Sequence, residues 1–167
     1  KSIILCNALL DMYVKCDMLE KAREVLEELA VRNVVSWSIL ISGYARYGLG
    51  NEAFCCYKMM QDEGLCPDAV TFICLLKACV GIGHLEMGEE IHEEVKKQGL
   101  LKKNIMIGTA VVDMYAKCGV LEKAQAVFDE LPRHNVVSWT ALLAGYAQLG
   151  ETESALDLFN GMVSKGI

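Results

Sequence analysis

Apolar residues recur along this chain at the three-to-four-residue spacing of helix faces. Trp37, Leu40 and Tyr44 share one face of a predicted helix, and Leu19 and Ala22 begin the apolar face of another whose remaining positions are charged. The strict apolar–polar alternation of a half-buried strand is not sustained anywhere. The pattern therefore predicts an all-α protein in which mostly apolar helices alternate with amphipathic, charged ones.

Long stretches of the chain occur twice, about 102 residues apart. Without any gap, about 27 of 63 aligned positions are identical, far more than unrelated sequences share. Because this distance is too long for one helical hairpin, we expect it to divide into units of about 31 to 36 residues. The recurring phrases begin at Asp11 and Asp113, at Leu19 and Leu121, and at Asn33 and Asn135.

Each unit is predicted as two helices separated by a short break, with a glycine ending most second helices. A hairpin of this size cannot bury its apolar face alone, so we expect the hairpins to stack. The predicted fold is an α-solenoid, a right-handed superhelix of antiparallel helical hairpins in one repeat array. The glycines expected at helix C-termini are Gly64, Gly99 and Gly166. The units are residues 3–33, 34–68, 69–104, 105–135 and the incomplete 136–167.

The net charge of the chain bears on whether it binds nucleic acid but does not decide the question. The 167 residues contain 16 Lys and Arg against 22 Asp and Glu, a formal net charge of −6, whereas a general nucleic-acid binder is normally basic. Much of the acidity lies in residues 20–28 and 86–94, in predicted second helices that we expect on the outer face. The eight cysteines form no CxxC pair and lie among apolar residues, which favours buried thiols in a reducing compartment.

Several phrases resemble the pentatricopeptide repeat family, specifically its plant PLS subclass. That subclass alternates short, standard and long repeats, as the predicted units do. The tetratricopeptide repeat fits less well, because its first helix needs Trp-x2-Leu-Gly-x2-Tyr and the glycine that follows Trp37 is misplaced. The phrases are Asn-Val-Val-Ser-Trp at 33–37 and 135–139, Asp-Met-Tyr-Ala-Lys-Cys-Gly at 113–119, and Gly-Tyr-Ala at 43–45 and 145–147.

The resemblance implies sequence-specific binding of single-stranded RNA, with one base per repeat, in the RNA metabolism of mitochondria or chloroplasts. Proteins of this subclass often bind RNA to select a cytidine for C-to-U editing, so the resemblance implies recognition of an editing site. It implies neither an enzymatic activity nor a cofactor for the repeat array. Because the chain begins at Lys1 without a methionine or a targeting segment, we expect a piece of a longer protein.

In this family the fifth residue and the last residue of a repeat read the base together, and we call them a reader pair. An ionised Asp only accepts hydrogen bonds, which suits the N–H groups of G or U, whereas Asn donates and accepts and suits A or C. The fifth residues are Asn7, Ser38, Ile73, Thr109 and Thr140. The last residues are Asn33, Asp68, Asn104 and Asn135, and the fifth unit stops before its own.

Resemblance to the pairing rules of the family implies a base for most repeats. The first pair, Asn7 with Asn33, implies a pyrimidine, C more than U. The second pair, Ser38 with Asp68, implies G. The fourth pair, Thr109 with Asn135, implies A. Thr140 alone implies a purine. The third pair departs from the pattern because Ile73 cannot form a hydrogen bond. The predicted target is 5′-Y-G-n-A-R-3′.

Two further sets of residues are candidates for RNA contact. The second residue of each unit shares a helix face with the fifth, and the family uses it to sandwich the base, although packing between repeats explains it too. Basic residues near the unit ends would track phosphates, or else complement the dipole of the helix before them. The second residues are Ile4, Val35, Val70, Met106 and Val137. The basic residues are Arg32, Lys102, Lys103 and Arg133.

No catalytic or metal site is predicted. Residues 92–94, His-Glu-Glu, match one half of a zinc deaminase motif, but the Pro-Cys-x-x-Cys half is missing. We therefore expect His92 to be an exposed side chain among glutamates. His84 and His92 are not four residues apart on a helix, so they form no metal pair. Trp37 and Trp139 are expected to pack between helices.

A protein-binding solenoid is the alternative function, because the same architecture can hold a peptide or a partner helix. In the PLS subclass, long repeats also contact accessory editing-factor proteins, and here that unit is 69–104. Uncapped apolar faces at the two ends of the array would favour end-to-end self-association. No apolar run approaches the length of about 18 residues that spans a bilayer, so we expect no membrane contact.

Overall fold

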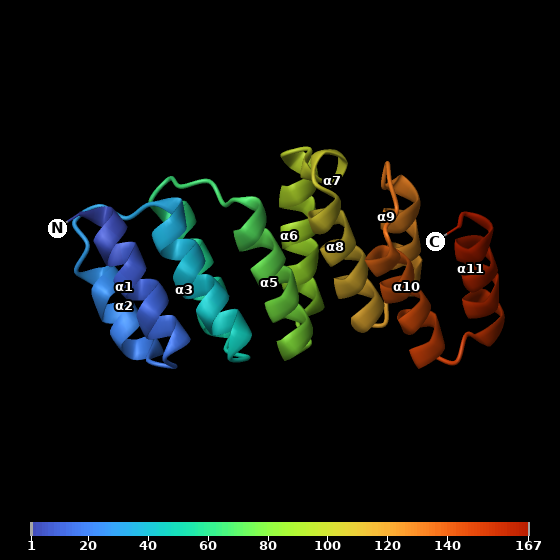
Figure 1. Ribbon diagram of the computed structural model, residues 1–167, viewed down its shortest axis with the longest axis horizontal. Helices are drawn as coiled ribbons and strands as arrows, with labels where there is room; N and C mark the ends of the chain where they lie inside the picture. Colours follow the sequence, from blue (N-terminus) through green and yellow to red (C-terminus); the bar gives the residue numbers. More distant parts are fainter. Residues whose placement is uncertain (1, 167) are drawn as a thin grey trace. The chain divides into compact units, whose positions relative to one another are not determined.

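The computed structural model describes residues 2–166, and every regular element in that range is an α-helix (Figure 1). The all-α prediction is confirmed. The chain divides into two compact units, one ending at Ile82 and the other beginning at Gly83. The first contains α1 (Ile3–Lys15), α2 (Leu19–Glu27), α3 (Val34–Arg46), α4 (Gly50–Asp62) and α5 (Ala69–Ile82). The second contains α6 (Leu85–Lys97), α7 (Leu100–Lys103), α8 (Ile105–Lys117), α9 (Leu121–Glu130), α10 (Val136–Gln148) and α11 (Thr152–Ser164).

Helical hairpins are the building block of both compact units. In the first, α1 packs on α2 and α3 packs on α4; in the second, α8 packs on α9 and α10 packs on α11. Short connections join the two helices of each hairpin, which makes them antiparallel neighbours. The helices α1, α3, α5, α8 and α10 begin at the first residues of the five proposed repeats, although the repeat boundaries themselves stay a prediction.

Glycines in the left-handed region end several helices. Gly64, Gly99 and Gly166 have φ angles of +72°, +66° and +71°, so the predicted C-terminal glycines are confirmed. Glycine adopts this conformation without the steric penalty of a Cβ atom. Asp17 is the one non-glycine residue in the described chain with such a backbone, at φ +60°, and the residue that corresponds to it about 102 positions later is Gly119.

The core of the first compact unit lies where α3 packs between α1 and α5. Gly43 allows α3 to approach α1 closely, because a Cβ atom there would lie only 2.8 Å from Cγ1 of Val14. Trp37 lies in this core with 2% of its surface exposed, as expected for packing between helices. The largest side chains that are fully buried here are Leu10, Leu26, Leu40, Ile41, Met60, Phe72, Leu75 and Leu76.

In the second compact unit, α8 packs against α6 and α7 on one side and against α10 on the other. Met114 of α8 fills the space above Gly88 of α6, where a Cβ atom would lie 2.6 Å from the methionine sulfur. The four-residue helix α7 was not expected, because four residues carry no readable periodicity. It forms after Gly99 ends α6, and the buried Leu101 attaches it to the core. None of the described helices combines the length and hydropathy of a bilayer-crossing segment.

Candidate nucleic-acid interface

Each predicted last residue caps the first helix that follows it. The side-chain Oδ1 atom accepts a hydrogen bond from the backbone N–H three residues later, at 2.9 Å for Asn33, 2.9 Å for Asp68, 3.4 Å for Asn104 and 2.7 Å for Asn135. Asn and Asp are favoured at this position because the first N–H groups of a helix have no partner within the helix. The cap gives these four side chains a defined orientation at the helix N-termini.

The first reader pair is brought together because α1 and α3 lie side by side. Asn7 donates a hydrogen bond from Nδ2 to Oδ1 of Asn33 at 3.4 Å, although the two residues are 26 positions apart. The Ser36 hydroxyl oxygen lies 2.7 Å from Oδ1 of Asn7 and 2.9 Å from Oδ1 of Asn33. Three side chains from two helices therefore form one small polar cluster.

The second reader pair is linked through a third side chain. The hydroxyl oxygens of Ser38 and Thr71 lie 2.6 Å apart, and Thr71 donates to Oδ1 of Asp68 at 2.8 Å. Ser38 Oγ also lies 2.7 Å from the carbonyl oxygen of Val34. Ser38 comes from α3, while Asp68 and Thr71 stand at the start of α5, so packing of α3 on α5 assembles this cluster.

The remaining fifth residues are less uniform. Thr109 donates to Oδ1 of Asn135 at 3.5 Å, a long contact that nevertheless joins the fourth pair. Thr140 is exposed, and its hydroxyl donates to carbonyl oxygens of its own helix. Ile73 belongs to the first compact unit and Asn104 to the second, so the third pair stays a prediction from the sequence alone.

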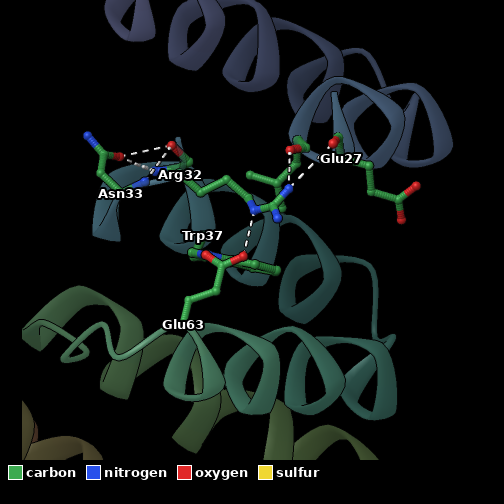
Figure 2. Close-up of polar contacts among 7 residues, drawn as sticks. Glu27, Arg32, Asn33, Trp37 and Glu63 are labelled. Carbon is green, nitrogen blue, oxygen red and sulfur yellow. Dashed lines mark hydrogen bonds and ion pairs between the residues drawn. The ribbon is translucent and has the colours of Figure 1, made fainter. Parts of the chain in front are cut away.

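Capping leaves one polar atom of each last residue unused. Because Oδ1 accepts from the helix, the amide assignment follows, and Nδ2 of Asn33, Asn104 and Asn135 donates no hydrogen bond among residues 2–166. Oδ2 of Asp68 likewise has no partner in this range. Figure 2 shows the Asn33 nitrogen pointing away from the contacts of its oxygen. These atoms offer a donor in the asparagine repeats and an acceptor in the aspartate repeat.

The second residues of the five repeats are all exposed. Their aliphatic side chains lie one helical turn before the fifth residues, so each exposed apolar surface is next to a reader position. This exposure leaves apolar surface available for a base, and packing between repeats can still account for the part of each side chain that is covered. Their exposed fractions are 76% for Ile4, 51% for Val35, 57% for Val70, 57% for Met106 and 57% for Val137.

Arg32 is engaged within the chain and is not a free phosphate ligand. Its Nε donates to the Glu63 carboxylate at 2.7 Å, and its Nη1 donates to the carbonyl oxygens of Leu26 at 3.2 Å and Glu27 at 3.4 Å. Figure 2 shows the guanidinium between Glu63 and Glu27. The guanidinium also lies 5.9 Å from the centroid of the Trp37 ring. These contacts at the C-terminus of α2 fit the second interpretation of Arg32, in which the cation complements the helix dipole.

The other basic candidates are free. Lys102, Lys103 and Arg133 are exposed, and none forms an ion pair within the part of the chain that the structure describes. Lys102 and Lys103 lie in α7, immediately before the cap residue Asn104. Three cations therefore stand next to last residues, where they can meet a phosphate.

The expectation that His92 is exposed is wrong. The side chain is half-buried, with Nδ1 2.9 Å from the Tyr115 hydroxyl and Nε2 buried without a partner. Burial lowers the pKa of His92 and raises the pKa of Tyr115 to about 12. The sequence could not foresee this contact because α8 supplies the tyrosine. Within residues 2–166, no three His, Cys, Asp or Glu side chains are arranged to hold a metal ion.

Sequence reasoning missed a further set of polar residues beside the reader pairs. The third residue of the second, third and fifth repeats is a fully buried serine or threonine. The signal was present, since Asn or Asp followed three positions later by Ser or Thr is a capping pattern. The hydrogen bonds of Ser36 to Asn7 and of Thr71 to Ser38, which reach a neighbouring helix, had no signal in the sequence, whereas within the described residues the Ser138 hydroxyl contacts only Asn135 of its own cap. The three buried third residues are Ser36, Thr71 and Ser138.

Stacked helical hairpins with capping residues at regular positions place the chain among the α-solenoid repeat proteins. The PPR repeat matches residues 4–34, 70–100, 109–136 and 137–167, and the PPR repeat family matches residues 32–81. The chain belongs to the pentatricopeptide repeat family.

Related proteins of known sequence come from Arabidopsis thaliana. The chain is 36% identical to a mitochondrial pentatricopeptide repeat-containing protein, with 99% of this chain and 26% of the relative covered. It is 36% identical to a chloroplastic one, with 96% and 26% covered. The chain thus spans about a quarter of the length of these relatives.

Solved structures share the fold. The chain matches the maize pentatricopeptide repeat protein PPR10 with a TM-score of 0.82 and 22% identity, covering 99% of this chain and 25% of that one. It matches PPR10 in complex with an 18-nucleotide psaJ RNA element with a TM-score of 0.79 and 24% identity, at the same coverage. The predicted α-solenoid is confirmed by this likeness.

Proposed function

We propose that this chain binds single-stranded RNA in a sequence-specific manner, with one base for each repeat. The observation that carries the proposal is the recurring meeting of a fifth residue with a last residue, as in Asn7 with Asn33 and Thr109 with Asn135. An exposed aliphatic side chain lies one turn away each time. A base needs polar atoms at its edge and apolar surface against its face, and this arrangement offers both.

The proposed target is 5′-Y-G-n-A-R-3′, read from the N-terminus of the chain to its C-terminus. The second pair, with an aspartate, would read G, and the fourth pair, with an asparagine, would read A. The aliphatic side chains from Ile4 to Val137 would hold each base between neighbouring repeats. Lys102, Lys103 and Arg133 would contact phosphates, which agrees with their exposure.

We place this binding in a mitochondrion or a chloroplast, and the names of the relatives support that location. The PLS subclass and the recognition of C-to-U editing sites rest on the motif resemblance. The proposed role is binding without catalysis and without a cofactor. The PPR10 complex supports RNA as the ligand class, because that protein of similar fold holds an RNA element.

Binding to a panel of short RNAs tests the proposal. The reference RNA carries 5′-C-G-U-A-A-3′ between uridine flanks, and each base is changed singly while fluorescence anisotropy measures affinity at fixed salt. We expect the largest losses at the second and fourth bases and the smallest at the third, where Ile73 reads nothing. Equal affinity for every RNA contradicts the proposal.

Self-association is a second proposal, and the apolar surface of α11 favours it. Leu156 of α11 is 57% exposed, whereas Phe54, its counterpart on α4, is 3% exposed because α5 covers it. Leu5 of α1 is 71% exposed, whereas its counterpart Ile107 is fully buried beneath α6 and α7. A second copy would place its α1 on α11 as α5 lies on α4.

Sedimentation at increasing protein concentration tests this contact. Leu156→Glu should hold the protein monomeric, while the matched control Glu153→Gln should associate like the wild type. Binding of a partner protein, such as an accessory editing factor at residues 69–104, would instead be the same in the wild type and in Leu156→Glu. A monomeric wild type at all concentrations contradicts self-association.

A further inference from the structure

The buried hydroxyl groups of Ser36 and Thr71 each join a reader pair of the first compact unit. We propose that these third residues are positioning residues, which decide whether the atoms that a reader pair offers to a base are donors or acceptors. The inference rests on the proposed function, because it assumes that the pairs face RNA. It adds a third position to the two that the family resemblance implies.

Ser36 orients two amides at once. Its hydroxyl lies 2.7 Å from Oδ1 of Asn7, and that oxygen only accepts, so the serine donates its proton there or shares it with Oδ1 of Asn33 at 2.9 Å. Both amide oxygens therefore point towards the Ser36 hydroxyl. The Asn7 nitrogen donates one of its two N–H groups to Oδ1 of Asn33 in a long contact of 3.4 Å, and the Asn33 nitrogen donates no hydrogen bond within the described residues, so each amide keeps a free N–H.

Two outward donors match one base better than the others. The pairing edge of C carries two neighbouring acceptors, N3 and O2, whereas the same edge of U has an N–H at position 3 that would face a donor. The proton of Ser36 thus favours C over U at the first position. Without this hydroxyl, the Asn7 amide is free to turn over and present its oxygen instead.

In the second pair, Thr71 and the Val34 carbonyl oxygen together hold the opposite polarity. The Ser38 hydroxyl contacts two protein atoms, the Val34 carbonyl oxygen at 2.7 Å and the Thr71 hydroxyl at 2.6 Å. In either arrangement of protons, Ser38 donates its single proton to one of these two atoms. Ser38, which keeps 8% of its surface exposed, therefore turns only a lone pair towards a base.

Asp68 completes this acceptor pair. Its Oδ1 accepts from the Thr71 backbone and hydroxyl, and its Oδ2 has no partner within the described residues. Two acceptors match the neighbouring N1–H and N2–H donors of G, whereas A carries an acceptor at N1. The same third position thus sets donors in one repeat and acceptors in the next.

The repeat that lacks a polar reader also lacks the hydroxyl. Ile73 is the fifth residue of the third repeat, and the third residue of the following repeat is Ile107, which is fully buried. The joint absence of both polar groups supports a link between the third and fifth positions.

Base preference in Thr71 variants tests the inference. Thr71→Val removes the hydroxyl but keeps the shape and the backbone N–H that Asp68 caps, whereas Thr71→Ser keeps a hydroxyl. We expect Thr71→Val to reduce the preference for G over A at the second base about five- to tenfold, with the first base read unchanged and Thr71→Ser close to the wild type. Ser42→Ala, a hydroxyl deletion elsewhere on α3, is the matched control.

The outcomes separate this inference from the proposed function. A wild-type preference for G that survives in Thr71→Val overturns the positioning role and leaves RNA binding intact. A wild type without any base preference overturns the proposed function. The positioning role can then be tested without RNA, by 15N relaxation of the Asn7 side-chain amide. This amide should move more in Ser36→Ala than in Ser36→Thr. Equal motion in the two variants overturns the inference.

Discussion

The indole N–H of Trp37 donates a hydrogen bond to the Glu63 carboxylate at 2.9 Å, and the same carboxylate holds Arg32 (Figure 2). The second copy of this sequence lacks the arrangement. Trp139 is 5% exposed with its N–H buried and unpartnered, and Lys165, which stands where the first copy has Glu63, places its ammonium 5.1 Å from the indole ring centroid. Two hairpins with corresponding sequences are therefore stabilised by different polar contacts.

Replacement of Glu63 by leucine should destabilise the protein by about 2 kcal/mol, because it leaves the buried Trp37 N–H and the Arg32 guanidinium without their acceptor. Lys165→Leu is the matched control and should cost less than about 0.5 kcal/mol, since it removes only an exposed cation near a ring. Urea unfolding monitored by circular dichroism measures both. An equal loss of unfolding free energy in the two variants would show that the hydrogen bonds of Glu63 do not stabilise the protein.

Asp17→Gly should stabilise the protein by about 0.5 to 1 kcal/mol. Asp17 has φ +60°, a conformation that costs an L-residue with a Cβ atom more than it costs glycine. The reciprocal variant Gly119→Asp should destabilise by a similar amount, because a Cβ atom at Gly119 meets no atom within 4 Å and only the backbone penalty remains. Thermal melts of both variants check the signs, and a destabilised Asp17→Gly contradicts the prediction.

Asn135→Asp should move base preference at the fourth position from A towards G without changing the other positions. Aspartate keeps the Oδ1 cap on α10 and replaces the free amide donor with an acceptor. The change in selectivity is expected at about tenfold, measured by competition between two labelled RNAs. Uniform loss of affinity at every position would mean that Asn135 acts only as a cap.

Acidification should weaken the fold through His92. Burial holds the pKa of this imidazole below its ordinary value, so the unfolded chain takes up the proton first as the pH falls. The unfolding free energy of the wild type should therefore fall as the pH drops through the unfolded value near about 6.5, with the contribution intact above it. The charged side chains around the imidazole are Glu93, Lys96, Lys123 and Glu130.

A pair of histidine variants isolates this effect. Between about pH 7.5 and about pH 5.5, His92→Gln should lose less stability than the wild type, because glutamine does not titrate. The exposed His84 provides the control, and His84→Gln should follow the wild type. Urea midpoints at the two pH values measure the difference. Parallel losses in all three proteins would contradict a role for His92.

Local signals account for the parts of the fold that were predicted. The glycines at Gly64 and Gly99, which were predicted to end helices, act within one helical turn, and so do the caps at Asn33 and Asn135, whose local signal was present but was not used in the prediction. The site was predicted less completely. The reader positions came from family resemblance, while the buried Ser36 cluster and the engagement of Arg32 were missed or left open.

The sequence by itself determined the periodicity, the helix starts and the all-α class, because these depend on interactions between residues three or four apart. Only the tertiary structure decided which atoms remain free. Asn7 meets Asn33 because α1 packs on α3, Arg32 is occupied because α4 presents Glu63, and His92 is half-buried because α8 supplies Tyr115. Each contact joins helices that are distant along the chain, and no local pattern specifies the partner that a polar side chain meets.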